Sequence, residues 1–253
     1  MDALPPIADP WFYAVAVPAV LLMGLSKSGF GGGLGALAVP VMALAVPVPQ
    51  AAAIMLPLLA VMDAVGLAAL WREADRVLLK LLLPAGLAGT VVGTLSFGLL
   101  ASATVAGIVG ALTLLFLAQR LFFPPQADAP PPPRWVGALL GVAAGFTSFV
   151  AHAGGPPVMA YVLPLRLAPI RFTATMAVFF AAVNASKWLP YAWLGLFDAR
   201  NLTTALLLMP LAPLGVWFGV RWARRMEPAL FYRLVHLGML LTGGKLLWDG
   251  LRG

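Results

Sequence analysis

The sequence has few charged residues and no cysteine. Only 10% of its 253 residues are charged and 62% are hydrophobic, whereas a soluble domain has about 25% charged residues. Sixteen basic and nine acidic side chains cannot cover a soluble protein of 26.5 kDa, and the mean hydropathy is +0.96. The composition therefore predicts an integral membrane protein with a lipid-covered surface, and it excludes a soluble enzyme.

The absence of cysteine excludes disulfides, thiol chemistry and cysteine-ligated metals. The two histidines and nine acids are scattered along the chain, so we expect no metal site and no cofactor. The hydrophobic residues form continuous runs and do not alternate with polar ones. This pattern predicts an all-α, polytopic membrane fold.

The net charge of +7 comes from basic residues that are gathered between apolar runs, notably within residues 72–80 and 221–225. Such clusters are typical of loops on the cytoplasmic side of a membrane. We therefore expect a multi-pass protein of the cell (inner) membrane and no nucleic-acid partner. The first ten residues carry two acids and no base, unlike a signal peptide, so we expect the first apolar run to be retained.

A proline-rich linker at residues 124–134 divides the chain into two repeats, 1–123 and 135–253. Its consecutive prolines are incompatible with a helix and indicate an extended segment. The repeats contain matching residues in the same order. The tetrapeptide Pro-Val-Met-Ala begins at Pro40 and again at Pro157, and Asp63 corresponds to Asn184.

Each repeat has five apolar runs, and the second run is shorter than the ~20 residues of a full crossing. That short run is expected to form a glycine-rich, interrupted hairpin with the run before it. Five passes would invert the second repeat relative to the first and put both basic clusters on the cytoplasmic side. We therefore predict two inverted repeats with about 8–10 transmembrane or half-membrane helices. The runs lie near residues 11–30, 34–48, 50–71, 78–99 and 102–123, and near 135–152, 155–165, 170–195, 201–222 and 229–250.

The first hairpin has six glycines within residues 24–35. Each glycine costs a helix interior ~1 kcal/mol relative to alanine, and irregular backbone persists in a bilayer only where it is buried or lines a wet cavity. Free N–H groups at a broken helix end suit an anion. The alternative is that the glycines only permit close helix packing. The candidate anion ligands here are Ser26, Lys27, Ser28, Gly31, Gly32 and Gly33.

The second hairpin, residues 145–157, matches the first in position and chemistry. Its histidine either donates to an anion or carries a proton, or it is a neutral side chain bonded to the backbone. The candidate substrate-binding residues here are Thr147, Ser148, His152, Gly154 and Gly155.

Three more polar side chains lie inside apolar runs, where an ionisable group indicates a functional site. Asn184 and Lys187 are three residues apart and share one helix face, so both are candidate substrate ligands. Lys187 could instead extend to the membrane interface. Asp63 either carries a coupling proton or is the counter-ion of Lys27 or Lys187.

Residues 26–35, 50–63, 145–157 and 179–195 resemble the sulfite exporter TauE/SafE family, also called the toluene sulfonate uptake permease family. The resemblance covers nearly the whole chain. It implies a duplicated permease for sulfur-containing anions such as sulfite, thiosulfate or organosulfonates. We therefore expect a transporter rather than an enzyme, working by alternating access with the anion between the repeats.

Two other functions remain open at this stage. One is transport of other small anions, such as carboxylates, and the other is a non-transporting membrane subunit that anchors a partner. An intramembrane enzyme would need a catalytic cluster, and the chain offers only Asp63 and His152. The expected partners are a small anionic substrate, membrane lipid and a second copy of the chain in a homodimer.

Overall fold

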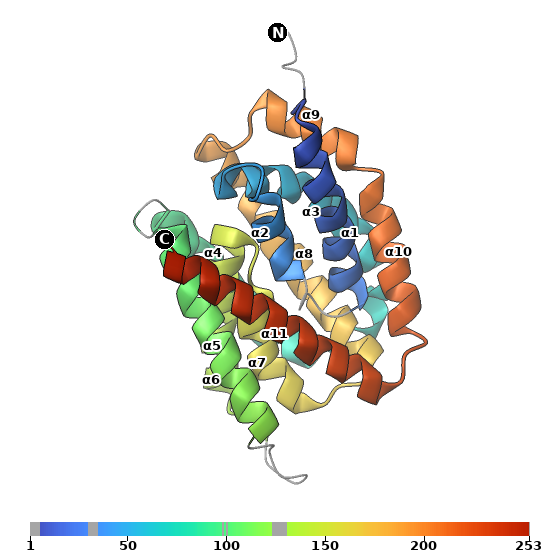
Figure 1. The fold of residues 1–253 in the computed structure, drawn as a ribbon. Coiled ribbons are helices and arrows are strands. Elements are labelled where there is room, and N and C mark those ends of the chain that lie inside the picture. The colour runs from blue at the N-terminus through green and yellow to red at the C-terminus, as the bar shows by residue number, and fades with distance from the viewer. Residues whose placement is uncertain (1–5, 30–34, 98, 100, 123–130, 253) are drawn as a thin grey trace.

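The computed structural model describes residues 6–29, 35–97, 99, 101–122 and 131–252, and every regular element in these ranges is helical (Figure 1). This confirms the all-α prediction. Gly31, Gly32 and Gly33 lie outside the described residues, as do most of the proline-rich linker and the side chain of Ser28.

The helices follow the predicted apolar runs closely in most places. The first half of the chain contains α1 (Pro10–Gly29), α2 (Ala38–Met42), α3 (Val48–Leu70), α4 (Arg76–Leu95) and α5 (Ser102–Phe122). The second contains α6 (Arg134–Ala151), α7 (Gly155–Val162), α8 (Pro169–Trp193), α9 (Ala199–Leu208), α10 (Leu211–Ala223) and α11 (Pro228–Arg252). Short 3₁₀ turns occupy Gly35–Leu37, Trp71–Glu73 and Leu163–Leu165.

One predicted run is divided in the structure. Residues 201–222 form the end of α9 and most of α10, and the two helices meet at a bend of 48°. The break falls at Met209 and Pro210. Proline lacks the N–H that would continue the hydrogen-bond ladder, and its ring clashes with the preceding turn.

Three described helices are long and apolar enough to cross a membrane: Pro10–Lys27, Pro49–Glu73 and Arg76–Leu95. The bent pair α9 and α10 is a fourth if it counts as one span. The central helix α8 has 25 residues, but it carries Arg171, Asn184 and Lys187, which lower its overall apolar character. The structure therefore supports three or four candidate spans by length and composition. The larger number expected from the sequence stays a prediction.

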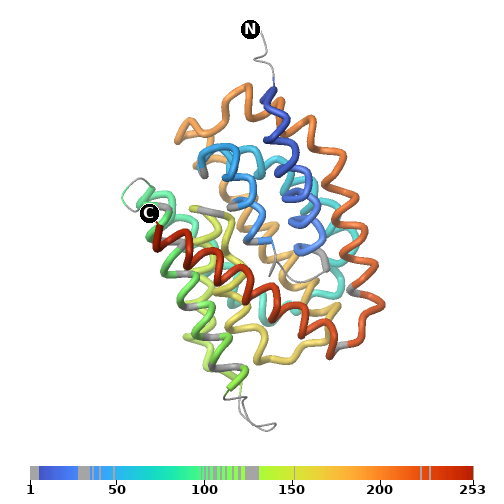
Figure 2. Tube along the Cα trace, viewed as in Figure 1, coloured from blue at the N-terminus to red at the C-terminus, as the bar shows by residue number. Residues whose placement is uncertain are grey.

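The main helix pairs each join one half of the chain to the other. The two long helices α3 and α8 pack together in the middle, α1 packs on α10, α4 on α6, and α5 on α11. In Figure 2 the chain of α1 runs beside that of α10, and α11 runs diagonally across the front from the lower end of α10 and packs against α5. The apolar core has two large parts, one formed with α1, α2, α3, α9 and α10, and the other with α4, α7, α8 and α11. Helix α3 belongs to the first part and α8 to the second, and the buried polar residues Asp63, Asn184 and Lys187 lie on these two helices.

Two glycine contacts bring these helix pairs close together. A Cβ atom on Gly24 in α1 would lie 2.9 Å from the Cα of Gly215 in α10. A Cβ atom on Gly145 in α6 would lie 1.9 Å from the carbonyl oxygen of Gly86 in α4. Small residues allow helix backbones to approach this closely in membranes. Gly24 and Gly145 therefore have a packing role.

The short elements α2 and α7 have five and eight residues, far below the ~20 of a full crossing. Between α6 and α7, His152 adopts a left-handed backbone conformation with φ of 51°. That conformation ends α6, and α7 begins three residues later at Gly155. The break puts the histidine side chain at the junction of the two helices.

Candidate functional site

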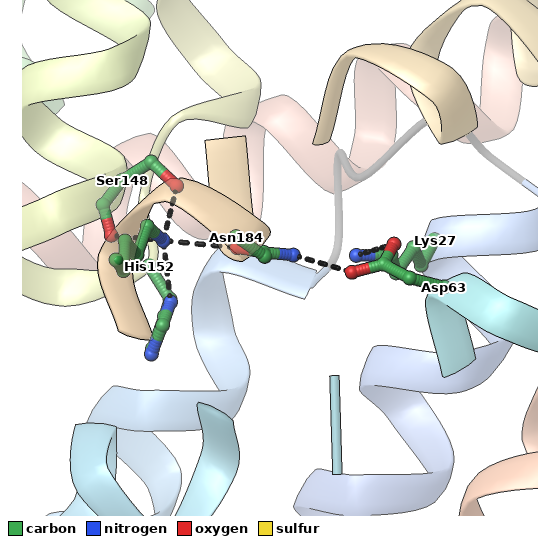
Figure 3. A network of polar contacts seen from close by, with 6 residues as sticks. Lys27, Asp63, Ser148, His152 and Asn184 are labelled. Carbon is green, nitrogen blue, oxygen red and sulfur yellow. Dashed lines mark hydrogen bonds and ion pairs between the residues drawn. The ribbon is translucent and has the colours of Figure 1, made fainter. Parts of the chain in front are cut away.

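A chain of buried polar contacts links the two central helices to the first hairpin (Figure 3). Lys27 from α1 forms an ion pair with Asp63 from α3, with Nζ 2.6 Å from Oδ1. The other carboxylate oxygen, Oδ2, accepts a 2.9 Å hydrogen bond from Nδ2 of Asn184 on α8. The pair that the sequence matched between repeats is thus hydrogen-bonded across the α3–α8 interface.

Lys187 continues this network on the other side of Asn184. Its Nζ donates to Oδ1 of Asn184 at 2.9 Å and lies 2.7 Å from both the carbonyl oxygen and Oγ of Ser148. It also lies 3.0 Å from Nδ1 of His152. Asn184 therefore joins two charged groups, with its amide nitrogen towards the carboxylate and its amide oxygen towards the ammonium. This pattern of contacts assigns the orientation of the amide.

The tautomer of His152 follows from its two neighbours. Its Nε2 lies 3.1 Å from the carbonyl oxygen of Ala52, near the start of α3. Because a carbonyl oxygen only accepts, Nε2 carries the hydrogen and Nδ1 accepts from Lys187. The sequence allowed for a neutral histidine bonded to the backbone, and this geometry matches that alternative.

The ionisable members of the network are almost fully buried. Lys187 is 0% exposed, Lys27 5% and Asp63 7%. Burying a charge is costly unless it is paired and hydrogen-bonded, and each of these groups has at least one close partner of opposite charge or with accepting lone pairs. Lys187 does not extend to the membrane interface, which was the alternative for it.

A small cavity lies beside the network, with a volume of about 30 Å³. One water molecule occupies about 10–15 Å³ on the same scale, so the cavity has room for two or three water-sized groups. Both hairpins contribute to its wall. Its polar lining comes from Lys27, Ser148, His152 and Asn184, its glycine lining from Gly35 and Gly155, and its apolar lining from Met23, Leu59 and Phe180.

Several candidate residues have contacts away from this cavity. Oγ of Ser26 accepts a 2.7 Å hydrogen bond from the N–H of Gly35, which joins α1 to the start of the 3₁₀ turn Gly35–Leu37. Oγ1 of Thr147 donates to the carbonyl oxygen of Ala143 at 2.8 Å, within its own helix. Gly154 packs tightly, because a Cβ there would lie 2.5 Å from the carbonyl oxygen of Ala144.

Lys187 is absent from the cavity wall as well, since it lies behind Ser148 and Asn184. Of the candidate ligands in the described residues, the structure thus brings Lys27, Ser148, His152, Gly155 and Asn184 together around the cavity.

The sequence analysis did not single out the apolar wall of the cavity. Met23, Leu59 and Phe180 each line it, and each lies four residues before a member of the polar network: Lys27, Asp63 and Asn184. Residues four apart share one face of a helix. Helical spacing from the buried polar residues would therefore have found this wall.

Tyr191 is a further buried polar residue that the sequence analysis did not assign to the site. Its hydroxyl donates to the carbonyl oxygen of Phe149 at 2.7 Å, and the two rings meet edge to face. This contact holds α8 against the end of α6. Among the described residues, no group of three or more histidine, aspartate or glutamate side chains could hold a metal ion.

The comparison with protein families gives one result. The family model described as "Sulfite exporter TauE/SafE" matches residues 16–246 of the chain. The match spans both halves of the chain and every residue of the polar network, and it confirms the resemblance found in the sequence motifs. Searches of the curated proteins and of the solved structures give no significant match.

Proposed function

Because the chain belongs to the sulfite exporter TauE/SafE family, we propose that it transports small sulfur-containing anions, such as sulfite or organosulfonates, across the cell membrane. The observation that carries this proposal is the cavity between the hairpins. A lysine ammonium, an amide, a hydroxyl and a histidine line it, and both repeats contribute them.

The donors around the cavity suit an oxyanion. One of the three N–H groups of Lys27 is directed to Asp63, and the side chain also lines the cavity. Nδ2 of Asn184 gives one hydrogen to Asp63 and has a second hydrogen to offer. The oxygens of a sulfonate accept hydrogen bonds and do not donate them, so these groups are complementary to it.

The helix pairing supports two inverted repeats. If α1 corresponds to α6 and α4 to the bent pair α9 and α10, then the α1–α10 contact and the α4–α6 contact are equivalent. The central α3–α8 pair and the outer α5–α11 pair each join corresponding helices. A two-fold axis between the repeats would produce this pattern, in which each helix contact has an equivalent contact with the two repeats interchanged.

The loops after the two central helices support the same correspondence. Asp75 caps α4 and forms an ion pair with Arg171 at the start of α8, with Nη2 2.9 Å from Oδ2. Asp198 caps α9 and binds Asn201, whose side chain accepts from Gln50 at the start of α3. In each case a residue early in one central helix contacts the N-terminal end of the helix that follows the other central helix. We therefore propose alternating access around the anion site.

Asp63 has features of both roles that the sequence left open. Its ion pair with Lys27 fits a counter-ion. Its burial inside the apolar helix α3 fits a proton carrier, because an ionisable group within a membrane span indicates a functional site. We propose that Asp63 serves as counter-ion of Lys27 and gains a proton during transport.

A reconstitution experiment tests the proposal. The purified chain, alone in liposomes, should carry labelled sulfite down a gradient, and methanesulfonate should compete with it more strongly than acetate of equal charge. Stronger competition by acetate would favour the carboxylate alternative. A lack of flux with any of these anions would favour a membrane subunit that anchors a partner.

A further inference from the structure

We propose that the site accepts one net negative charge per anion, so that a dianion binds only together with one proton. The inference rests on the proposed function and names the charge class of its substrate. It follows from the hydrogen bonds of the polar network, which fix how many positive charges the buried site contains.

The first step is the charge on Lys187 and His152. The carbonyl oxygen of Ser148, Oδ1 of Asn184 and Nδ1 of His152 all face Nζ of Lys187 within 3.0 Å. All three atoms accept hydrogen bonds and none donates one. The Lys187 nitrogen must therefore carry three hydrogens of its own, which makes it an ammonium. If His152 were protonated at Nδ1, Lys187 would have to be neutral to accept that hydrogen. The pair therefore carries one positive charge in either arrangement.

The second step is the charge on Lys27 and Asp63. Their 2.6 Å contact is an ion pair with no net charge. Among the described residues, Asp63 is paired with Lys27 from α1, and Asn184 connects it to Lys187 on α8, which in turn contacts His152 at the end of α6. The neighbouring helices α9 and α10 carry their charged residues at their ends. The network around the cavity therefore has one net positive charge.

A monoanion neutralises this charge. A dianion leaves one uncompensated negative charge inside the protein, where charge–charge interactions are strong and solvation is lost. A proton on Asp63 removes that excess, because it leaves Lys27 free to face the anion. Sulfite exchanges between its monoanion and dianion near neutral pH, so the rule decides which form the protein carries.

Methanesulfonate and sulfate provide matched probes, since they have the same shape and number of heavy atoms. Methanesulfonate has one charge and sulfate two throughout the range from about pH 6 to pH 8. Binding of each is measured by calorimetry on the purified protein in nanodiscs. We expect constant affinity for methanesulfonate and a gain of about tenfold in sulfate affinity for each unit that the pH falls, as uptake of one proton requires.

The pH dependence is the diagnostic result, because the apolar wall favours the methyl group at every pH. Sulfate binding that does not change with pH, beside tight methanesulfonate binding, would overturn the charge rule and leave the proposed function intact. If neither anion binds, both proposals fail.

Two isosteric substitutions at the hydrogen-bonded pair provide an independent check. Asp63→Asn raises the net charge by one, and sulfate should then bind without any pH dependence. Asn184→Asp lowers it by one, and methanesulfonate affinity should fall at least about tenfold. Equal sulfate pH profiles in Asp63→Asn and the unchanged protein would contradict the assignment of the proton to Asp63.

Discussion

We expect anion binding to depend most directly on Lys27, because it is the lysine that lines the cavity. A buried, charge-assisted hydrogen bond is worth ~1.5–3 kcal/mol. Lys27→Ala should therefore weaken sulfite binding about ten- to a hundredfold, as measured by calorimetry. Lys27→Arg should not restore it, because a planar guanidinium does not replace a compact ammonium.

A control for Lys27→Ala is needed because that substitution leaves the carboxylate of Asp63 buried without its partner. Removing one partner of a buried ion pair destabilises a protein by about 3–5 kcal/mol, so Lys27→Ala alone could lose binding through misfolding. The double variant Lys27→Ala with Asp63→Asn leaves no unpaired carboxylate and should recover thermal stability without recovering binding. Sulfite binding of normal affinity in the double variant would show that Lys27 is not a ligand.

Tyr191 should separate stability from binding. Its hydroxyl bonds to the backbone of Phe149, and Tyr191 does not line the cavity. Tyr191→Phe should lower the free energy of unfolding by about 1 kcal/mol, the usual worth of one hydrogen bond, and leave anion affinity unchanged. A tenfold loss of affinity in a folded Tyr191→Phe protein would place this hydroxyl in the site.

The sequence predicted the buried polar residues but not their partners. Asp63, Asn184 and Lys187 stood out because they interrupt apolar runs. Whether Lys27 or Lys187 pairs with Asp63 depends on how α1 and α8 pack on α3, which sequence spacing does not contain. The structure pairs Asp63 with Lys27 and puts Asn184 between Asp63 and Lys187.

Among the helices, the contact between α4 and α6 depends on glycine. Gly145→Ala would place a Cβ atom 1.9 Å from the backbone oxygen of Gly86, which cannot move aside without shifting the helix. We expect Gly145→Ala either to lower the melting temperature by several °C or to reduce the amount of protein expressed. Gly66→Ala on α3 is the matched control, because a Cβ there meets nothing within 4 Å.

The control should be neutral or stabilising by up to about 1 kcal/mol, since alanine favours a helix over glycine. Equal melting temperatures for Gly145→Ala and Gly66→Ala, measured by scanning fluorimetry, would show that the α4–α6 contact is looser than described.

Helix positions were largely predictable from apolar runs, but helix breaks were not. The run near 50–71 became α3 (Val48–Leu70), and the run near 170–195 became α8 (Pro169–Trp193). The 34–48 run yields a helix of only five residues. Hydrophobicity alone does not distinguish a continuous helix from one that is interrupted by proline or closed by a hydroxyl such as that of Ser26.

The proposed inverted arrangement of the two halves predicts the sidedness of two loops. With an odd number of passes in each repeat, Arg76 and Arg224 lie on the same, cytoplasmic side. The chain has no cysteine, so Arg76→Cys and Arg224→Cys each introduce a single reactive thiol. A membrane-impermeant maleimide added to intact cells should label neither, and it should label both after the membrane is opened. Labelling of only one from outside would exclude the inverted arrangement.

The central claim is that a small sulfur oxyanion binds between the two hairpins. A crystal structure determined with selenite, the selenium analogue of sulfite, tests it most directly, because anomalous scattering locates selenium without ambiguity. The account predicts a selenium peak in the cavity, within hydrogen-bond reach of Lys27, Ser148 and Asn184. Selenium peaks confined to other places, with none in this cavity, would contradict it.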